Sequence, residues 1–398
     1  MATLMESDDA LVAAVVLILA LTMCSTCVRW RGAPSSDPEA ALDGAGSLLG
    51  PYESLHLVPK RGRSQAIIVF VPGNPGHPHF YLQFARTLSE RCGVEIVLLG
   101  LAGHITSAAA AQLNADDRAR TFGIREQVEH VAARTVPHMR RAKRLGVPVC
   151  LVGHSIGGWI ALEAACVLGA IPMPVMGVGG TRRSTRRQSR RTVSPCRDRE
   201  SDEALPDADV DLHVLAMMPF LSTAPDECTA AVTEKLRAVN MLGGRFAVLA
   251  GGLGALLHRT PRALLRWLLA GEIRSLRPPV GAFVLDEVVH ATSLRNMAHL
   301  AQSEMNALAR PYDFDRAASP LAAARRLHLL YVENDQWAPV AMAHRAAESG
   351  VPCDILRDQT GAAPMAHAFS VQREEACGAR VTDWCAAWIQ RVLELGPR

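Results

Sequence analysis

Short apolar runs alternate with longer helix-forming segments along most of the chain. Runs with the length and the β-branched or aliphatic content of buried strands lie at residues 66–71, 149–152, 212–217, 327–332 and 353–356. Near the C-terminus, residues 381–393 carry apolar side chains at helical spacing, which is typical of a helix that packs one face on a core. Strands that alternate with helices predict an α/β fold with a mostly parallel central sheet and helices on both faces.

The N-terminal segment, residues 1–31, contains a long uncharged run. Residues 10–28 lack charged side chains, and about nineteen mostly apolar residues suffice to cross the roughly 30 Å of hydrocarbon in a bilayer. Acidic residues precede this run while Arg29 and Arg31 follow it, so we expect an anchor helix with the rest of the chain on the cytosolic side. A cleaved signal peptide is the alternative, although such peptides begin with basic residues.

Two further segments lack the apolar pattern of a folded core. Residues 32–51, rich in Ala, Gly, Ser, Pro and Asp, predict a flexible linker. Residues 181–211 begin with clustered arginines and then turn acidic, so they predict a disordered insertion. Serines among these arginines leave open a regulatory role through phosphorylation or contact with anionic lipid. The predicted core then consists of residues 52–180, 212–225 and 321–398.

Residues 226–320 interrupt the strand pattern and predict a helical lid or cap. Residues 245–257 are apolar but too short to span a bilayer, and arginines flank both them and the next apolar segment, residues 262–269. Such a helix pair suits insertion into a lipid surface, where basic groups meet headgroups. The same apolar faces suit a buried cap over an active site equally well, so both interpretations stay open.

A candidate nucleophile lies where the second apolar run ends. Residues 153–157 read Gly-His-Ser-Ile-Gly, a G-x-S-x-G motif, and helix-forming residues follow it. Glycines are needed on both sides because side chains there would collide with the neighbouring strand and helix, while the serine adopts strained dihedrals. The pattern predicts a sharp strand-to-helix turn that exposes the hydroxyl of Ser155.

A serine hydroxyl needs a base to take its proton and a carboxylate to orient that base, and in this fold both follow the serine in the order acid, then histidine. Asp335 directly follows the apolar run 327–332, where a carboxylate would reach the carboxyl end of the sheet. We therefore expect Asp335 to be the acid, with Glu333 and Asp313 as rivals.

The expected base is His367, in the loop between the last apolar run and the C-terminal helix. Of the fourteen histidines in the chain, this one has the position that the order of the triad requires. The rivals are His290, His299 and His344, which lie in the middle region or in a helical run.

Two backbone N–H groups should stabilise the oxyanion of the reaction. One belongs to Ile156, the residue after the nucleophile, and the other comes from the loop after an early strand. That loop reads Pro-Gly-Asn-Pro-Gly at residues 72–76, where glycines permit unusual dihedrals and Pro75 has no N–H to donate. Asn74 is therefore the expected second donor, although an ordinary turn would have a similar composition.

The chain resembles the lipid droplet-associated serine hydrolases, a branch of the α/β-hydrolases linked to neutral lipid metabolism. The resemblance rests on Phe70-Val71-Pro72-Gly73-Asn74-Pro75-Gly76, Leu151-Val152-Gly153-His154-Ser155-Ile156-Gly157, Met218-Pro219-Phe220-Leu221-Ser222-Thr223, Asp335-Gln336-Trp337-Ala338-Pro339 and His367-Ala368-Phe369. It covers most of the chain from about Tyr52 onward. It implies the α/β-hydrolase fold and assigns the nucleophile to Ser155, the acid to Asp335 and the base to His367. Glu333 and Asn334 depart from the family's pattern, which leaves substrate preference open.

Composition excludes several other classes of protein. The net charge of +3 is too small to indicate nucleic-acid binding. The ten cysteines are scattered, and the single C-x-x-C pair, Cys24 and Cys27, lies in the hydrophobic N-terminal run without a second pair, so zinc is not expected. Nothing in the sequence calls for another metal or for an organic cofactor.

These observations predict a serine hydrolase of apolar lipid esters, of the sterol ester or acylglycerol type. We expect it at the surface of lipid droplets or of the endoplasmic reticulum membrane, with the catalytic domain facing the cytosol. The alternatives are a lipid-surface or organising protein with little catalysis, and an acyltransferase that uses the same triad. His154 and His104 should lie near the pocket in packing or supporting roles. The sequence does not indicate an oligomeric state.

Overall fold

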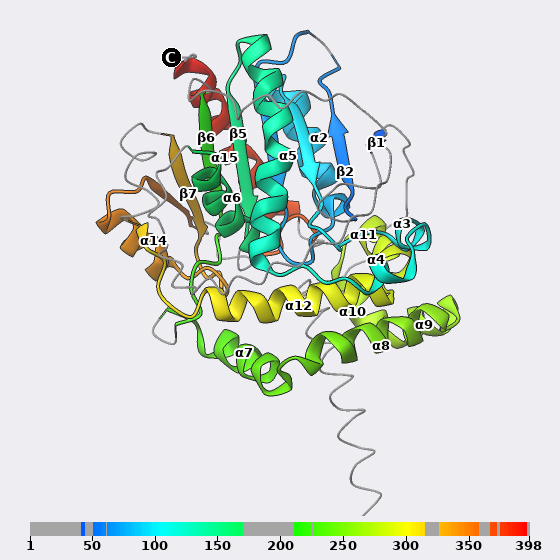
Figure 1. Ribbon diagram of the computed structural model, residues 1–398. Coiled ribbons are helices and arrows are strands. Elements are labelled where there is room, and N and C mark those ends of the chain that lie inside the picture. Colours follow the sequence, from blue (N-terminus) through cyan, green and yellow to red (C-terminus); the bar gives the residue numbers. More distant parts are fainter. Residues whose placement is uncertain are drawn as a thin grey trace, which may run out of the picture.

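A computed structural model describes residues 41–43, 51–60, 62–169, 211–224, 227–314, 326–357, 367–371 and 375–395. The expected anchor at residues 1–31, nearly all of the expected linker and the expected insertion up to residue 210 lie outside these ranges. Figure 1 shows the described part as a central sheet with helices on both faces and a further group of helices across one end.

The core of the protein is an eight-stranded sheet in the order β1-β2-β4-β3-β5-β6-β7-β8. Its strands are β1 (Ala41–Asp43), β2 (Ser54–Leu57), β3 (Ile67–Val71), β4 (Glu95–Leu99), β5 (Val149–His154), β6 (Leu212–Met217), β7 (Leu327–Val332) and β8 (Cys353–Leu356). Strands β1 and β2 pair antiparallel, as do β2 and β4, and all other neighbours pair parallel. The five apolar runs are strands β3 and β5 to β8, so the predicted mostly parallel α/β fold is confirmed.

The parallel strands at the centre of the sheet are covered on both faces. Every residue of β3, β4, β5 and β6 is buried, which explains why their sequences are mostly apolar on both faces rather than alternating. Helices α5 (Ile124–Leu145) and α6 (Ile156–Val167) cover one face, and α2 (Leu82–Cys92) and α15 (Glu375–Leu395) pack together on the other (Figure 1).

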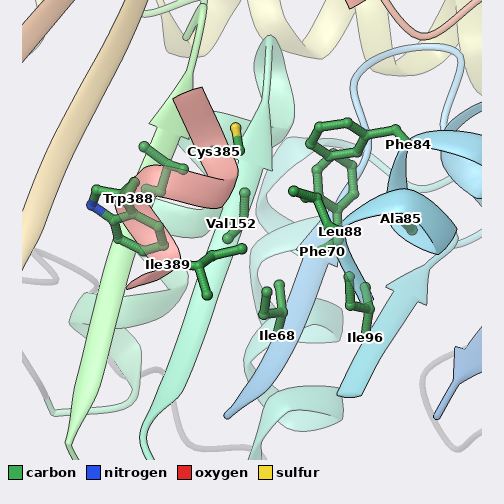
Figure 2. Close-up of a pocket in the computed structure, with 11 residues that line it drawn as sticks. Ile68, Phe70, Phe84, Ala85, Leu88, Ile96, Val152, Cys385, Trp388 and Ile389 are labelled. Atoms are coloured by element: carbon green, nitrogen blue, oxygen red, sulfur yellow. The ribbon is translucent and has the colours of Figure 1, made fainter. Parts of the chain in front are cut away.

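The packing of α15 confirms the predicted apolar stripe. Figure 2 shows Cys385, Trp388 and Ile389 of this helix over β5 and β6, in the same layer as Phe84 and Leu88 of α2. The hollow between them measures about 10 Å³, which barely admits one water molecule. These side chains therefore form core packing and not a ligand site.

Shorter elements complete the α/β core. They are the 3₁₀ helix η1 (Pro78–Tyr81) and the helices α3 (Ser107–Ala111), α4 (Ala115–Ala119) and α14 (Val340–Glu348). Side chains of Thr106 and Asn114 accept hydrogen bonds from the first turns of α3 and α4, as helix N-caps do.

Between β6 and β7 the chain forms a group of helices, residues 227–314, which we call the cap. It comprises α7 (Ala230–Leu242), α8 (Arg245–Arg259), α9 (Arg262–Leu268), α10 (Ala270–Ser275), α11 (Pro278–Phe283), the π-helix η2 (Val284–Val288) and α12 (Ala291–Ala307). Helix α12 lies between the sheet and the outer helices α7 and α8 (Figure 1).

Helix α12 is attached to the core by side-chain hydrogen bonds along its length. Ser293 bonds the ring of His77 at 2.8 Å, and Asn296 accepts from the N–H of Phe122 at 3.1 Å. Ser303 accepts from the N–H of Ile124 at 2.9 Å. These partners come from two separate parts of the core. Helix α12 is therefore held firmly against the core and is not a loosely packed lid.

Outer helix α8 has two apolar faces. One face is buried against α12 and includes Phe246, Ala250 and Gly254. The other face is exposed and continues onto α9, with large apolar side chains at Val248, Leu249, Leu256, Leu264, Trp267 and Leu268. The exposed fraction reaches 73% at Trp267 and 53% at Leu268, so these side chains contribute little to folding. We call this exposed set the apolar outer face.

Within the ranges that the structure describes, no single helix is both long and apolar enough to cross a bilayer. Helices α7 and α8 meet that requirement only when taken together, and they are bent by 91° at the break between them.

The close contact between α8 and α12 generates a first prediction. A Cβ atom on Gly254 would lie 2.7 Å from the backbone of His290, where neither side can give way. We expect Gly254→Val to lower the free energy of unfolding by about 1–3 kcal/mol, as overpacking does. Gly252→Val is the matched control, because Gly252 lies on the same helix and a Cβ atom added there would meet no atom within 4 Å. Chemical denaturation measures the free energy of unfolding of both variants. An equal decrease in the two would contradict the prediction that the contact with His290 is responsible.

A buried carboxyl on α12 generates a second prediction. Burial raises the pKa of Glu304 to about 8, although a hydrogen bond from Asn74 opposes the rise. The folded state therefore holds a proton that the unfolded chain releases near its ordinary pKa of 4.5, and stability falls as the pH rises from about 4.5 to about 8. We expect Glu304→Gln to remove this decline and to be more stable than the parent at pH 9, by on the order of a few kcal/mol.

Thermal unfolding of the parent and of Glu304→Gln between pH 5 and pH 9 measures this effect. Glu129→Gln is the control, because Glu129 is an exposed glutamate on α5. A stability difference that stays constant over the whole pH range would show that Glu304 does not carry the proton.

Candidate active site

The turn between β5 and α6 holds Ser155 in a backbone conformation that few residues adopt. Its dihedrals are φ 57° and ψ −128°, and a non-glycine residue held there costs about 1–3 kcal/mol. The sheet fixes both sides of the turn: Ser155 donates its N–H to the carbonyl of Met217, and its own carbonyl accepts from Phe220 and Gly158. The turn therefore presents the hydroxyl at the carboxyl end of the parallel strands.

Close packing explains the flanking glycines. A Cβ on Gly153 would lie 2.1 Å from the carbonyl oxygen of Gly157, and a Cβ on Gly157 would lie 2.3 Å from that of Pro72. Both contacts are with backbone atoms, which cannot move aside. Only glycine allows the strand, the helix and the loop after β3 to meet at this point, as the sequence predicts.

The side chains of Ser155, His367 and Asp335 form a continuous hydrogen-bonded row. The Oγ of Ser155 lies 2.8 Å from Nε2 of His367, and Nδ1 of His367 lies 2.7 Å from Oδ2 of Asp335. The other carboxylate oxygen of Asp335 accepts N–H bonds from Trp337 and Ala338. With both oxygens bonded and the side chain buried, the carboxylate is fixed in orientation and requires a proton on Nδ1. Nε2 is then free to accept the serine proton.

The structure places the rival residues elsewhere. Glu333 follows β7 and is half-buried, Asp313 is exposed at the end of the cap, and His344 is exposed on α14. His290 bonds the carbonyl of Ile105 instead, and His299 lies on α12. The loop that leads to His367, with Gly361 and Pro364, is outside the described residues.

The expected oxyanion donors lie on both sides of Ser155. Ile156 is the first residue of α6, where an N–H has no carbonyl partner one turn earlier. The loop after β3 packs directly on the nucleophile, since a Cβ on Gly73 would lie 2.9 Å from the Cβ of Ser155. Asn74 follows in the same loop and lines the hollow at Ser155.

The structure also shows contacts of this loop that sequence reasoning missed. The side-chain amide of Asn74 donates to the carbonyl of Met297 at 3.0 Å, and it lies 3.4 Å from Glu304. The loop is thus attached to helix α12 of the cap. The partners are more than two hundred positions apart in sequence, and no local pattern could have indicated this contact.

The hollow at the triad is small. Residues of the loop after β3, of η1 and of the loop after His367 line it, including Asn74, Phe80, Ser155, His367 and Val371. Its volume is about 30 Å³, enough for a water molecule but far below the several hundred Å³ of pockets that take larger ligands. Among the residues that the structure describes, no group of three or more His, Cys, Asp or Glu is placed to hold a metal ion.

Comparison with solved structures supports the fold alone. A haloalkane dehalogenase from Agrobacterium tumefaciens superposes with a TM-score of 0.54 over 89% of this chain and 97% of its own, at 14% sequence identity. A peroxisomal α/β-hydrolase from Saccharomyces cerevisiae superposes with a TM-score of 0.52 over 89% of each chain, at 10% identity. The architecture is therefore that of the α/β-hydrolases.

Comparison with characterised sequences identifies the family. The lipid droplet-associated hydrolase of Drosophila melanogaster is 32% identical over 103 residues, which cover 24% of this chain and 32% of that protein. The human protein of the same name is 28% identical over 123 residues, 29% of this chain and 37% of that protein. The matched segment thus spans about a third of the length of these curated relatives. The model of the lipid-droplet associated hydrolase family matches residues 64–369, more than half of the chain, and the protein belongs to this family.

Proposed function

We propose that the protein is a serine hydrolase that cleaves esters of apolar lipids through an acyl-enzyme intermediate. Membership of a hydrolase family supports the general activity. The observation that carries the specific proposal is the row of Ser155, His367 and Asp335, joined by bonds of 2.8 and 2.7 Å. This geometry is what a hydroxyl nucleophile, a base and an orienting acid require.

In the proposed first step, Oγ of Ser155 attacks the ester carbonyl while Nε2 of His367 takes its proton. Asp335 stabilises the imidazolium, and the N–H groups of Asn74 and Ile156 bind the oxyanion. His367 then returns the proton to the leaving alcohol. Water, deprotonated by the same histidine, attacks the acyl-enzyme, and the carboxylic acid leaves with Ser155 regenerated.

The substrate class is supported by the family and by the apolar outer face. Curated relatives are named lipid droplet-associated hydrolases, and the apolar outer face suits contact with the surface of a lipid droplet. Arg245 and Arg259 are exposed at the ends of α8, where they can meet anionic headgroups. The small hollow at the triad requires the surrounding side chains to move before an acyl chain can enter.

Two alternatives use the same structure differently. An acyltransferase would admit an alcohol in place of water to the acyl-enzyme, so only the accepting molecule differs. A droplet-organising protein would bind lipid through the apolar outer face without depending on Ser155. The hydrogen-bonded triad favours a catalytic role over the second alternative, because packing alone does not require three polar side chains in this order.

Ser155→Ala tests the proposed mechanism. We expect the parent to react with a fluorophosphonate probe and to hydrolyse p-nitrophenyl butyrate and an emulsified sterol ester or triacylglycerol. The variant should lose labelling and at least about 10⁴-fold in kcat, because removal of a triad nucleophile costs that much. Ser64→Ala is the control, since Ser64 bonds backbone near the opposite end of β3. Ester hydrolysis that survives in Ser155→Ala would refute the proposal.

The apolar outer face generates a separate prediction. We expect Trp267→Asp combined with Leu268→Asp to reduce binding to phospholipid-coated triolein droplets at least about tenfold, because each buried apolar side chain contributes about 1.5–3 kcal/mol. Hydrolysis of soluble p-nitrophenyl butyrate should be unchanged. Flotation with the droplets measures the bound fraction.

Val58→Asp provides the matched control for droplet binding. Val58 is 60% exposed, similar to the cap residues, but it lies after β2 on the α/β core. Equal loss of binding in both variants, or no loss in the cap variant, would show that the apolar outer face is not the lipid contact.

A further inference from the structure

A chain of buried polar groups lies behind the triad and connects two loops of the site. The N–H of Gly73, in the loop after β3, lies 3.2 Å from the hydroxyl of Tyr81. That hydroxyl lies 2.7 Å from Nδ1 of His154. The opposite ring nitrogen of His154 lies 3.0 Å from the backbone carbonyl of His367. The two ends of the chain are therefore the loop that holds an oxyanion donor and the residue that acts as base.

The direction of each hydrogen bond follows from the groups themselves. A carbonyl only accepts, so Nε2 of His154 must carry the proton that bonds His367. Burial, together with the nearby His367, holds the pKa of His154 well below its ordinary value, so the ring is neutral and carries a single proton. Nδ1 is therefore an acceptor, and Tyr81 donates its hydroxyl proton to Nδ1 while accepting from Gly73. Each hydrogen bond in the row therefore has a single direction.

Packing alone does not account for these polar atoms. Tyr81 and His154 are each 4% exposed, and aromatic side chains surround them, with Phe70 and Phe369 among the neighbours. Phenylalanine would fill both positions with a similar shape and without polar atoms that need partners in the core. The hydroxyl of Tyr81 and the imidazole of His154 must therefore have a role other than filling space in the core.

We propose that His154 and Tyr81 are positioning residues that hold the base His367 and the oxyanion loop in register with Ser155. This inference rests on the proposed serine hydrolase function. His154 fixes the backbone of His367, from which the catalytic imidazole extends, and Tyr81 fixes the backbone next to Asn74. A neutral His154 also leaves His367, whose ring lies 5.0 Å away, free to become positively charged without a second cation beside it.

The proposal predicts a specific pattern among variants of these two residues. We expect His154→Phe to lower kcat for p-nitrophenyl butyrate by about 10–100-fold with KM changed less than about threefold, because misplaced catalytic groups cost rate rather than binding. The kcat of His154→Gln should be at least about tenfold higher than that of His154→Phe, since the glutamine amide can donate to the carbonyl of His367. Tyr81→Phe should lower kcat in the same direction.

The double variant tests whether the groups form one chain. Residues that act as a unit have non-additive effects, so Tyr81→Phe with His154→Phe should be no more than about threefold slower than the slower single variant. Multiplied losses would contradict a connected chain. Rates are normalised to active sites by fluorophosphonate titration, so that loss of folded protein does not count as loss of rate.

His130→Gln and His130→Phe are the matched controls. His130 is also a buried neutral histidine whose Nε2 lies 3.1 Å from a backbone carbonyl, that of Gly100, but it lies on α5 outside the site. We expect both variants to keep kcat per active site within about threefold, even where the melting temperature falls.

The outcomes separate this proposal from the proposed function. If Ser155→Ala retains activity, the serine hydrolase function itself fails. If Ser155→Ala is inactive while His154→Phe and Tyr81→Phe keep kcat within about threefold of the parent, only the positioning role fails. If His154→Phe does not fold, Tyr81→Phe decides the question. A kcat within about threefold of the parent refutes the positioning role, and a larger loss in Tyr81→Phe that His154→Gln does not share supports it.

Discussion

The strained conformation of Ser155 is the constraint on which the rest of the site depends. It places the hydroxyl above the end of β5, and it persists because Ser155 is hydrogen-bonded to Met217, at the end of β6, and to Phe220, in the loop after that strand. The contact between Gly153 and Gly157 then leaves no room for a relaxed turn with larger residues. A strain of about 1–3 kcal/mol is tolerated here because the fully buried strands around the turn provide far more stabilisation.

The proposed base, His367, and the proposed acid, Asp335, are held near this hydroxyl by different means. Asp335 lies in the turn just after β7, and three hydrogen bonds through its two carboxylate oxygens hold it in place. His367 comes from a loop, so its backbone has no strand to fix it. The bond from His154, the last residue of β5, to the carbonyl of His367 supplies that constraint. The proposed nucleophile and the residue that holds the backbone of the proposed base thus share one short segment, residues 153–157.

The sequence predicts what depends on neighbours along the chain. The five apolar runs have the lengths of the observed strands because a covered parallel sheet requires continuous apolar residues, and the glycines around Ser155 are dictated by local sterics. Contacts between distant segments could not be predicted: the bond from Asn74 to Met297 joins residues that only the complete fold brings together. Residues 245–257 were compatible with both a buried cap and a lipid-inserting helix. An apolar pattern does not indicate which face of a helix packs on protein, and α8 has one apolar face buried and another exposed.

The arrangement of the cap connects its outer surface to the catalytic loop. The outer helices pack on α12 through the glycine face of α8, and α12 in turn bonds the side chain of Asn74 beside the nucleophile. Helix α12 thus holds the loop after β3 in place, while bonds at the ends of β5 and β7 hold Ser155 and Asp335. Tyr81 and His154 in turn join the loop after β3 to the backbone of His367, so buried hydrogen bonds connect the cap to both sides of Ser155.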